Sequence, residues 1–139
     1  MEIQKDFKEL LELFNIHKVE YLIVGGYALA FHGAPRFTGD IDLLVKADTE
    51  NAKRILSALE EFGFGSMELS EVDFISPNPV RVDIMTSITA VDWEKAQANK
   101  VQSSYGDTPT YFISKADFIA NKRALGRKKD LADLEALGQ

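Results

Sequence analysis

The chain has 139 residues, of which 45% are hydrophobic and 27% charged, and its formal net charge is −6. This length allows one domain with a substantial core, and the composition matches a soluble globular protein. No run of the sequence approaches the roughly 18 apolar residues that a membrane span needs. The acidic balance also argues against extensive contact with duplex nucleic acid. We therefore expect a single domain over residues 1–139 that does not enter a membrane.

The sequence contains no cysteine and two histidines, His17 and His32. Disulfides, thiolate nucleophiles and thiolate metal ligands are therefore excluded, and the two histidines lack the spacing of a zinc site. Any bound metal is expected to have oxygen ligands, which favours Mg²⁺ or Mn²⁺. The N-terminus has mixed charge and lacks the basic and apolar blocks of a signal peptide, so we expect a cytoplasmic location.

The first half of the sequence alternates between helical and strand patterns. Apolar residues at three- and four-residue spacing indicate helices, and short apolar runs indicate strands. These signals predict, in chain order, a helix that ends near His17, a strand over Tyr21–Val24, a short helix from about Gly26 to His32, a strand over residues 41–46, and a helix between the cap Asp48 and Gly63. Pro35 separates the short helix from the second strand, because a proline disfavours helical geometry in the residue before it.

The second half predicts more strands and three further helices. Strand-like runs at residues 67–75 and 80–88 flank a Ser-Pro-Asn-Pro sequence at 76–79, which is typical of an antiparallel hairpin. The remaining predicted elements are a short helix opened by Asp92, a strand pair at 100–105 and 110–113, a helix capped by Ser114, and a last helix after Gly126. This order predicts an α/β (α+β) fold, in which helices pack on a small sheet of mixed or mostly antiparallel strands.

A glycine pair lies where the first predicted strand gives way to a helical pattern. Gly25 and Gly26 follow the apolar run Tyr21–Val24 directly. Backbone N–H groups at such a turn favour an anion, and the absence of a Cβ lets a ligand approach the backbone. Taken alone, two glycines after a strand are more often an ordinary turn.

Three aspartates provide a second signal. Because side chains of a strand alternate between its faces, Asp40 and Asp42 point to the same side, roughly 7 Å apart. Such a pair can share divalent cations, although the pattern also occurs on exposed strand faces. Asp83 lies between apolar residues of a later strand-like run, where a lone carboxylate is costly unless it binds something. A surface ion pair with Arg81 is the alternative for Asp83.

A basic segment follows residue 114, against the acidic balance of the whole chain. Its basic residues are Lys115, Lys122, Arg123, Arg127, Lys128 and Lys129. They cannot all face one site, and most of such a run is expected to form a solvated helix end. Lys122 and Asp130 are the residues of this segment that we expect at a binding site.

The three signals together resemble the polymerase-β-like nucleotidyltransferase superfamily. The residues that carry the resemblance are Gly25-Gly26, Asp40-Ile41-Asp42 and Arg81-Val82-Asp83-Ile84. Within the superfamily, the run at 25–33 with Arg36 and Thr38 is most similar to small bacterial enzymes related to abortive-infection toxin nucleotidyltransferases, and residues 121–134 resemble their helical lysine motif. The resemblance implies a mixed sheet with helices on one side, and C-terminal helices 114–138 that complete a nucleotide cleft.

The resemblance also implies roles for the candidate residues. Asp40, Asp42 and Asp83 are expected to be catalytic and to hold Mg²⁺ or Mn²⁺, with Asp83 next to the acceptor oxygen. The expected nucleotide-binding residues are Gly25, Gly26, Arg36, Thr38, Lys122 and Asp130. Lys122, with Arg36 as a second candidate, would neutralise charge on the triphosphate or on the departing pyrophosphate.

Three functional hypotheses follow from the sequence. The first is a nucleotidyltransferase that moves a nucleoside monophosphate from an NTP such as ATP to a hydroxyl of an RNA end, a protein or a small molecule. The alternative is a non-catalytic nucleotide-binding or partner-binding module, for example half of a toxin–antitoxin pair, whose carboxylate triad would be expected to have decayed. A metal-dependent phosphohydrolase would need further His and Asp ligands. A partner chain or a homodimer interface could select the acceptor.

Overall fold

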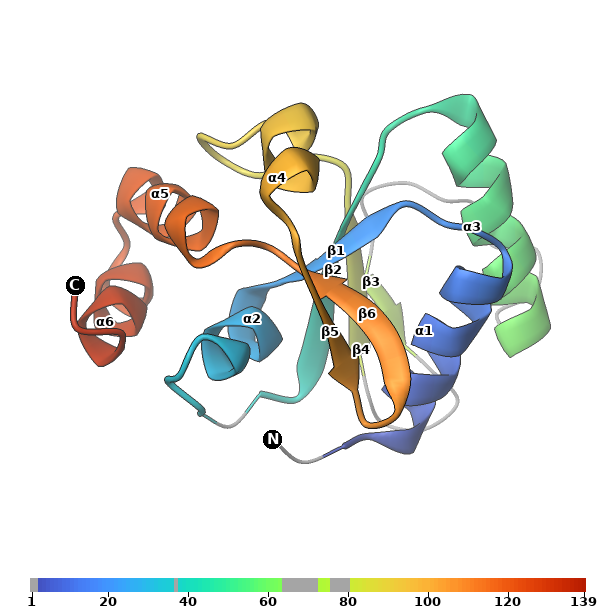
Figure 1. Cartoon of the computed structure of the whole chain (residues 1–139), viewed down its shortest axis with the longest axis horizontal. Helices are drawn as coiled ribbons and strands as arrows, with labels where there is room; N and C mark the ends of the chain where they lie inside the picture. The colour runs from blue at the N-terminus through green and yellow to red at the C-terminus, as the bar shows by residue number, and fades with distance from the viewer. Residues whose placement is uncertain (1–2, 37, 64–72, 76–80) are drawn as a thin grey trace.

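The computed structural model describes residues 3–36, 38–63, 73–75 and 81–139 (Figure 1). The elements in these ranges are α1 (Lys5–Ile16), β1 (Tyr21–Val24), α2 (Gly25–Phe31), β2 (Asp40–Val45), α3 (Thr49–Phe62), β3 (Asp73–Ile75), β4 (Arg81–Met85), α4 (Trp93–Asn99), β5 (Val101–Tyr105), β6 (Thr108–Phe112), α5 (Lys115–Leu125) and α6 (Lys128–Ala136). None of the helices in these ranges is long and apolar enough to cross a membrane.

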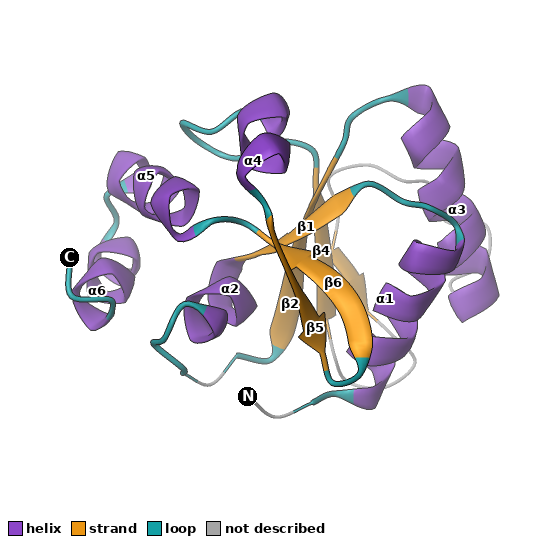
Figure 2. Cartoon of the chain, viewed as in Figure 1, coloured by secondary structure: helices purple, strands orange, loops and turns teal. Residues whose placement is uncertain are grey.

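The described strands form one mixed sheet in the order β3-β4-β2-β1-β6-β5 (Figure 2). β1 lies at its centre, antiparallel to β2 and parallel to β6. β4 runs parallel to β2, and the two outer strands β3 and β5 are antiparallel to their neighbours. The predicted α/β fold with a mixed sheet is therefore confirmed.

Helices lie on both sides of this sheet. α1 and α3 pack against each other on one side, whereas α2, α5 and α6 lie on the other (Figure 1). The resemblance implied helices on one side, and the structure differs from that expectation. The physical reason is that β1 is buried along its whole length, so both faces of the central strand need cover from water.

Most predicted elements are present, with changes at their ends. β3 and β4 pair antiparallel as expected, while the predicted turn at 76–79 and the strand-like residues 67–72 lie outside the described residues. β4 ends at Met85, before the predicted residue 88, because the chain turns there: Ile88 bridges to Val91, and Ala90 has a positive φ of 69°. The caps predicted at Asp48, Asp92 and Ser114 each accept a backbone hydrogen bond from their helix.

Aromatic rings fix the short helix α2 in the core. The Tyr27 ring of α2 makes edge contacts with Phe7 of α1 and Tyr105 of β5, at centroid distances of 5.6 and 5.7 Å. The Tyr105 hydroxyl in turn accepts a hydrogen bond from the Gln4 backbone N–H. Since such pairs stabilise specific ring orientations, they hold the glycine turn at the start of α2 in place.

The buried side chain of Asn51 ties the start of α3 to the sheet. Its Oδ1 accepts from the Glu20 backbone N–H at 2.8 Å, and its Nδ2 donates to the carbonyl oxygens of Glu20 and Lys46 at 3.0 and 2.9 Å. Asn51 is 0% exposed, and each of these hydrogen bonds is at least partly buried, so the loss of the amide would leave these backbone groups poorly compensated. This single amide therefore links the residue before β1 to the residue after β2.

We expect Asn51→Ala to lower the free energy of unfolding by about 2 kcal/mol, because three part-buried backbone groups lose a hydrogen bond at roughly 1 kcal/mol each and the Glu20 carbonyl keeps a second partner, the Lys46 N–H. Urea denaturation measures the change. Lys53→Ala, at an exposed position of the same helix, is the control and should change the free energy by less than about 0.5 kcal/mol. An equal effect of both variants would contradict the assigned role of Asn51.

Candidate active site

Three carboxylates converge from two neighbouring strands. Asp40 and Asp42 lie on β2, and the parallel register of β2 with β4 places Asp42 directly opposite Asp83. One carboxylate oxygen of each residue lies within 4.8 Å of the others. Among the described residues, this is the one group of carboxylates or histidines close enough to share a metal ion. The structure thus brings together the three aspartates that the sequence singled out.

The electrostatics of this cluster favour a bound cation. Burial raises the pKa of Asp42 above that of an ordinary aspartate, and the charge of Asp40 raises it further. A hydrogen bond with Asp83 and the charges of Lys122 and Arg81 act in the opposite direction. The donor set consists of oxygen atoms only, and its charges are incompletely neutralised by the chain. These properties fit a hard divalent cation such as Mg²⁺ or Mn²⁺.

Arg81 is part of the same surroundings. Its Nε donates to Asp83 Oδ1 over 2.9 Å, so the ion pair considered as the alternative for Asp83 is present. The pair does not remove Asp83 from the cluster, because a carboxylate has two oxygens and several lone pairs. Arg81 therefore orients Asp83 while Asp83 still faces Asp42.

The glycine turn packs directly on the carboxylates. Gly25 has a φ of 67°, and a Cβ on it would lie 2.0 Å from Asp42 Oδ2. A Cβ on Gly26 would lie 3.0 Å from Thr38 Oγ1. This close approach follows from the sheet, because the antiparallel β1–β2 register places Val24 opposite Asp42. Gly25 is therefore required by its backbone conformation and by Asp42, whereas a Cβ at Gly26 would press on Thr38 alone.

Thr38 contacts Asp40 of the carboxylate cluster. Its hydroxyl lies 3.1 Å from the Asp40 carbonyl oxygen and 3.0 Å from Asp40 Oδ1, and it can donate to either. The sequence predicted Thr38 as a nucleotide-binding residue. In the structure it lines the same cavity as Asp40 and also holds that carboxylate in position.

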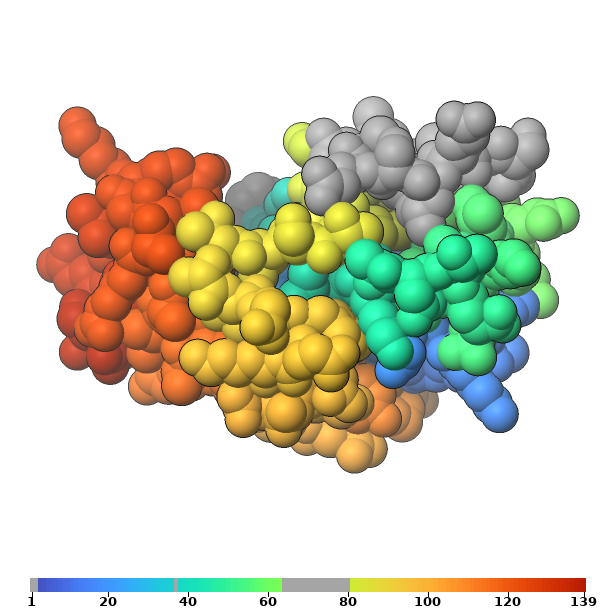
Figure 3. All heavy atoms as spheres, turned by 90° about the horizontal axis from the view of Figure 1, so that it is seen from above, coloured from blue at the N-terminus to red at the C-terminus, as the bar shows by residue number. Residues whose placement is uncertain are grey.

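A cavity of about 700 Å³ opens beside the carboxylates. Its walls come from the β1–α2 turn, β2, the segment after β4 and the two C-terminal helices, and they include Gly25, Gly26, Arg36, Thr38, Asp40, Asp42, Ser87, Ile88, Asn121, Lys122, Arg127, Lys129 and Asp133. In the space-filling view, the C-terminal helices adjoin the segment after β4 (Figure 3). Residues far apart in sequence therefore share one cavity, with acidic groups on β2 and basic groups on and around α5 and α6.

Lys122 is fixed by two acidic residues of α6. Its Nζ lies 3.3 Å from Asp130 Oδ1 and 3.5 Å from Asp133 Oδ2, and its side chain is 12% exposed. Asp130 is 0% exposed and does not line the cavity. A hydrogen bond from Arg127 is the main reason why the pKa of Asp130 falls to about 2. Asp130 was predicted as a nucleotide-binding residue. In the structure it lies outside the cavity wall and binds the side chains of Lys122 and Arg127, which line the cavity.

Asp133 and Arg127 are cavity residues that the sequence analysis missed. Asp133 accepts from Arg36 Nε at 3.2 Å and from Arg36 Nη2 at 3.4 Å. Arg127 was expected in a solvated helix end, yet it lines the cavity and its Nε lies 2.6 Å from Asp130 Oδ2. The spacing of three residues between Asp130 and Asp133 was the available signal, because it places both on one face of a helix.

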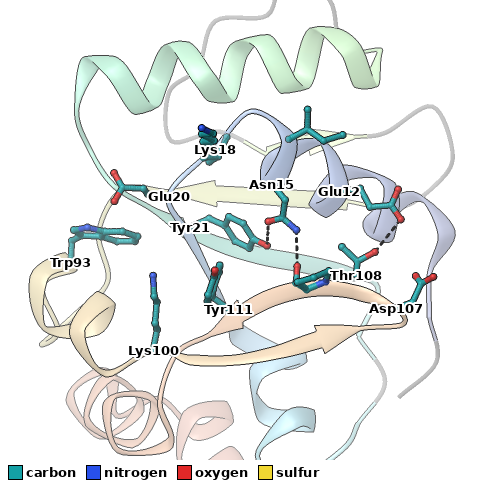
Figure 4. A pocket seen from close by; sticks show the side chains of 13 residues that line it. Glu12, Asn15, Lys18, Glu20, Tyr21, Trp93, Lys100, Asp107, Thr108 and Tyr111 are labelled. Carbon is teal, nitrogen blue, oxygen red and sulfur yellow. Dashed lines mark hydrogen bonds between the residues drawn. The ribbon is translucent and has the colours of Figure 1, made fainter.

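A second cavity, of about 660 Å³, lies on the other side of the sheet (Figure 4). Tyr21, Trp93 and Tyr111 contribute aromatic rings to it. The Tyr21 hydroxyl lies 3.0 Å from Asn15 Oδ1, and Asn15 Nδ2 donates to the Pro109 carbonyl at 2.7 Å. These polar groups bind each other, and the described carboxylates here form no metal cluster. The first cavity is therefore the candidate active site.

The comparison with family models gives the class of protein, a nucleotidyltransferase. Residues 1–138 match the family model described as "Nucleotidyltransferase of unknown function (DUF6036)", and the protein belongs to this family. No curated protein matches the sequence. The nucleotidyltransferase class predicted from the glycine pair and the spaced aspartates is confirmed, and it is consistent with the polymerase-β-like superfamily.

Solved structures of three other proteins share the fold. The lincomycin-bound lincosamide antibiotic adenylyltransferase LnuA is 18% identical, with a TM-score of 0.67, and the match covers 100% of this chain and 99% of LnuA. Protein TM1012 of Thermotoga maritima has the same identity and TM-score over 93% of this chain and 88% of its own. The antibiotic-resistance factor ANT(2'')-Ia is 15% identical, with a TM-score of 0.67, over 95% and 80%. At these identities the similarity establishes the fold.

We expect Gly25→Ala to weaken Mn²⁺ binding by about 10- to 100-fold, because the new Cβ displaces Asp42. Substitutions of residues that hold metal ligands in place have effects of this size in other proteins. Calorimetric titration with Mn²⁺ measures the affinity. Gly33→Ala is a matched control, since Gly33 also has a positive φ but a Cβ there meets nothing within 4 Å. Both variants should lose stability through backbone strain, and only Gly25→Ala should lose Mn²⁺. Equal Mn²⁺ affinities would contradict the close approach.

Proposed function

We propose that the protein transfers a nucleoside monophosphate from an NTP to an acceptor hydroxyl, in a reaction that requires Mg²⁺ or Mn²⁺. The observation that carries this proposal is the convergence of Asp40, Asp42 and Asp83 on one point, beside a cavity that also holds Lys122 and Arg36. A carboxylate cluster that can bind metal ions, next to the cations of Lys122 and Arg36, suits a triphosphate. A triphosphate is stabilised by metal ions and by cationic side chains. A volume of about 700 Å³ falls in the range that encloses a small organic ligand such as a nucleotide.

The carboxylates would hold the metal ions in this reaction. When bound, the ions neutralise charge on the triphosphate and help the acceptor hydroxyl to lose its proton. Thr38 keeps the carboxylate of Asp40 in place, and Arg81 does the same for Asp83. The chain thus supplies a preorganised set of ligands, which lowers the reorganisation needed when substrate arrives.

The reaction replaces one bond to phosphorus with another. The acceptor oxygen bonds to the α-phosphorus, the bond from that phosphorus to the bridging oxygen of the β-phosphate breaks, and pyrophosphate leaves. Asp83 is our candidate for taking up the hydroxyl proton before it passes to water, because β4 is one strand further than β2 from the glycine turn. Lys122 and Arg36 would stabilise the charge that develops on the pyrophosphate.

We favour a small molecule as the acceptor and ATP as the NTP. Two proteins of similar fold, LnuA and ANT(2'')-Ia, are described as an antibiotic adenylyltransferase and an antibiotic-resistance factor. The match covers 99% of LnuA, which supports the proposal that a domain of this size can hold the residues for catalysis. An RNA end and a protein hydroxyl remain alternative acceptors, and the net charge of −6 disfavours long contacts with duplex RNA.

The proposal is tested by turnover of each NTP with Mg²⁺ and a panel of hydroxylated small molecules, RNA ends and protein extracts. Pyrophosphate release and a mass increase of one nucleoside monophosphate on the acceptor are the measurements. We expect Asp42→Asn to reduce turnover by about 10³-fold or more, because the site loses a ligand and a charge that the metal ions need.

Asp48→Asn is the matched control for Asp42→Asn. It makes the same chemical change at a helix cap outside the cavity, and asparagine caps helices as well as aspartate does. Its turnover should equal that of the wild type. Metal-dependent NTP binding without turnover of any acceptor would favour the alternative, a non-catalytic nucleotide-binding module. Turnover that Asp42→Asn leaves unchanged would refute the proposed site.

A further inference from the structure

Asp133 is an acidic residue in a cavity that, on the proposed function, receives a polyanion. It lies on α6, lines the cavity together with Lys122 and Arg36, and has 9% of its side chain exposed. A carboxylate in this position repels phosphate groups through space. Its presence in the cavity wall therefore calls for a compensating role.

The contacts of Asp133 show what that role can be. Its two oxygens accept from Nε and Nη2 of Arg36 at 3.2 and 3.4 Å, and Oδ2 also lies 3.5 Å from Lys122 Nζ. Arg36 belongs to the loop between α2 and β2, whereas Lys122 belongs to α5. One carboxylate thus holds side by side two cations that lie far apart in the sequence.

The two cations depend on Asp133 to different degrees. Lys122 has Asp130 as a second partner at 3.3 Å and is largely buried. The side chain of Arg36 is 48% exposed. Among the described residues, Asp133 is the carboxylate with which it forms an ion pair. A half-exposed arginine without a partner samples many rotamers, and ordering it costs free energy when a ligand binds. Asp133 therefore matters most for Arg36.

We propose that Asp133 is a positioning residue for nucleotide binding, which holds Arg36 against the cavity beside Lys122 so that both cations meet the triphosphate. This inference rests on the proposed function. Arg36, Lys122 and Arg127 together with Asp130 and Asp133 keep a net charge of one positive unit, so the carboxylates orient the cations without cancelling them. The planar guanidinium also retains the N–H groups of Nη1, which Asp133 does not use and which can bind a phosphate oxygen.

The sign of the effect separates this role from simple electrostatics. If Asp133 acted only through its charge, Asp133→Asn would strengthen the binding of an anionic nucleotide, because a repulsive charge disappears. If Asp133 positions Arg36, the same substitution weakens binding. A purely structural role would lower thermal stability and leave the affinity of the folded protein unchanged.

The test is calorimetric titration of the wild type, Asp133→Asn, Arg36→Met and the double variant with α,β-methylene ATP in the presence of Mg²⁺. We expect Asp133→Asn to weaken binding by about tenfold, the loss of one charge-assisted interaction. We expect the double variant to bind about as weakly as Arg36→Met alone, because Asp133 acts through Arg36. Binding by Asp133→Asn that equals or exceeds wild type, or single effects that multiply in the double variant, would overturn the inference.

Controls separate this inference from the proposed function. Glu135→Gln makes the same charge change at an exposed position of α6 and should leave the affinity unchanged. If Asp133→Asn fails to fold, Arg36→Lys takes its place, since lysine keeps the charge but loses the two-nitrogen contact with Asp133 and should also weaken binding. Unchanged binding by Arg36→Lys would then overturn the inference. A wild type that does not bind the analogue would overturn the proposed function itself.

Discussion

The structure depends on a register that holds like charges together. The parallel pairing of β2 with β4 places Asp42 opposite Asp83, and the alternation of β2 adds Asp40 on the same face. This arrangement is unfavourable by itself, since burial and the neighbouring charge both raise the pKa of Asp42. The hydrophobic contacts of the sheet provide the stability that offsets this cost, and a bound cation, as we propose, would relieve it.

The cationic side of the cavity differs from the carboxylate cluster, because its positive charges are paired with carboxylates of the chain. Lys122 and Arg127 contact Asp130, and Arg36 contacts Asp133. Each of these pairs includes a carboxylate with less than a tenth of its side chain exposed, which fixes the direction of its partner. The helices α5 and α6 therefore present cations with defined geometry, and the acidic overall charge of the chain does not prevent a local site for phosphate groups.

Local patterns in the sequence predicted those parts of the site that depend on residues close together in the sequence. The period of two in a strand placed Asp40 and Asp42 on one face, and a lone charge in an apolar run marked Asp83. The resemblance to a known superfamily added Lys122 and Arg36. The contact of Asp133 with Arg36 could not be predicted in this way, because it joins residues 97 positions apart. The helices on the second side of the sheet could not be predicted for a similar reason. They depend on the burial of both faces of β1, which the sequence pattern of this strand does not by itself reveal.

The central claim is that the three carboxylates bind a nucleotide through a metal ion. Calorimetric titration of each NTP, with Mg²⁺ and with EDTA in its place, tests this claim most directly when the wild type is compared with the double variant Asp40→Asn/Asp42→Asn. We predict binding that requires Mg²⁺ in the wild type and disappears in the double variant. Binding that persists in EDTA, or that the double variant retains at wild-type affinity, would contradict the account.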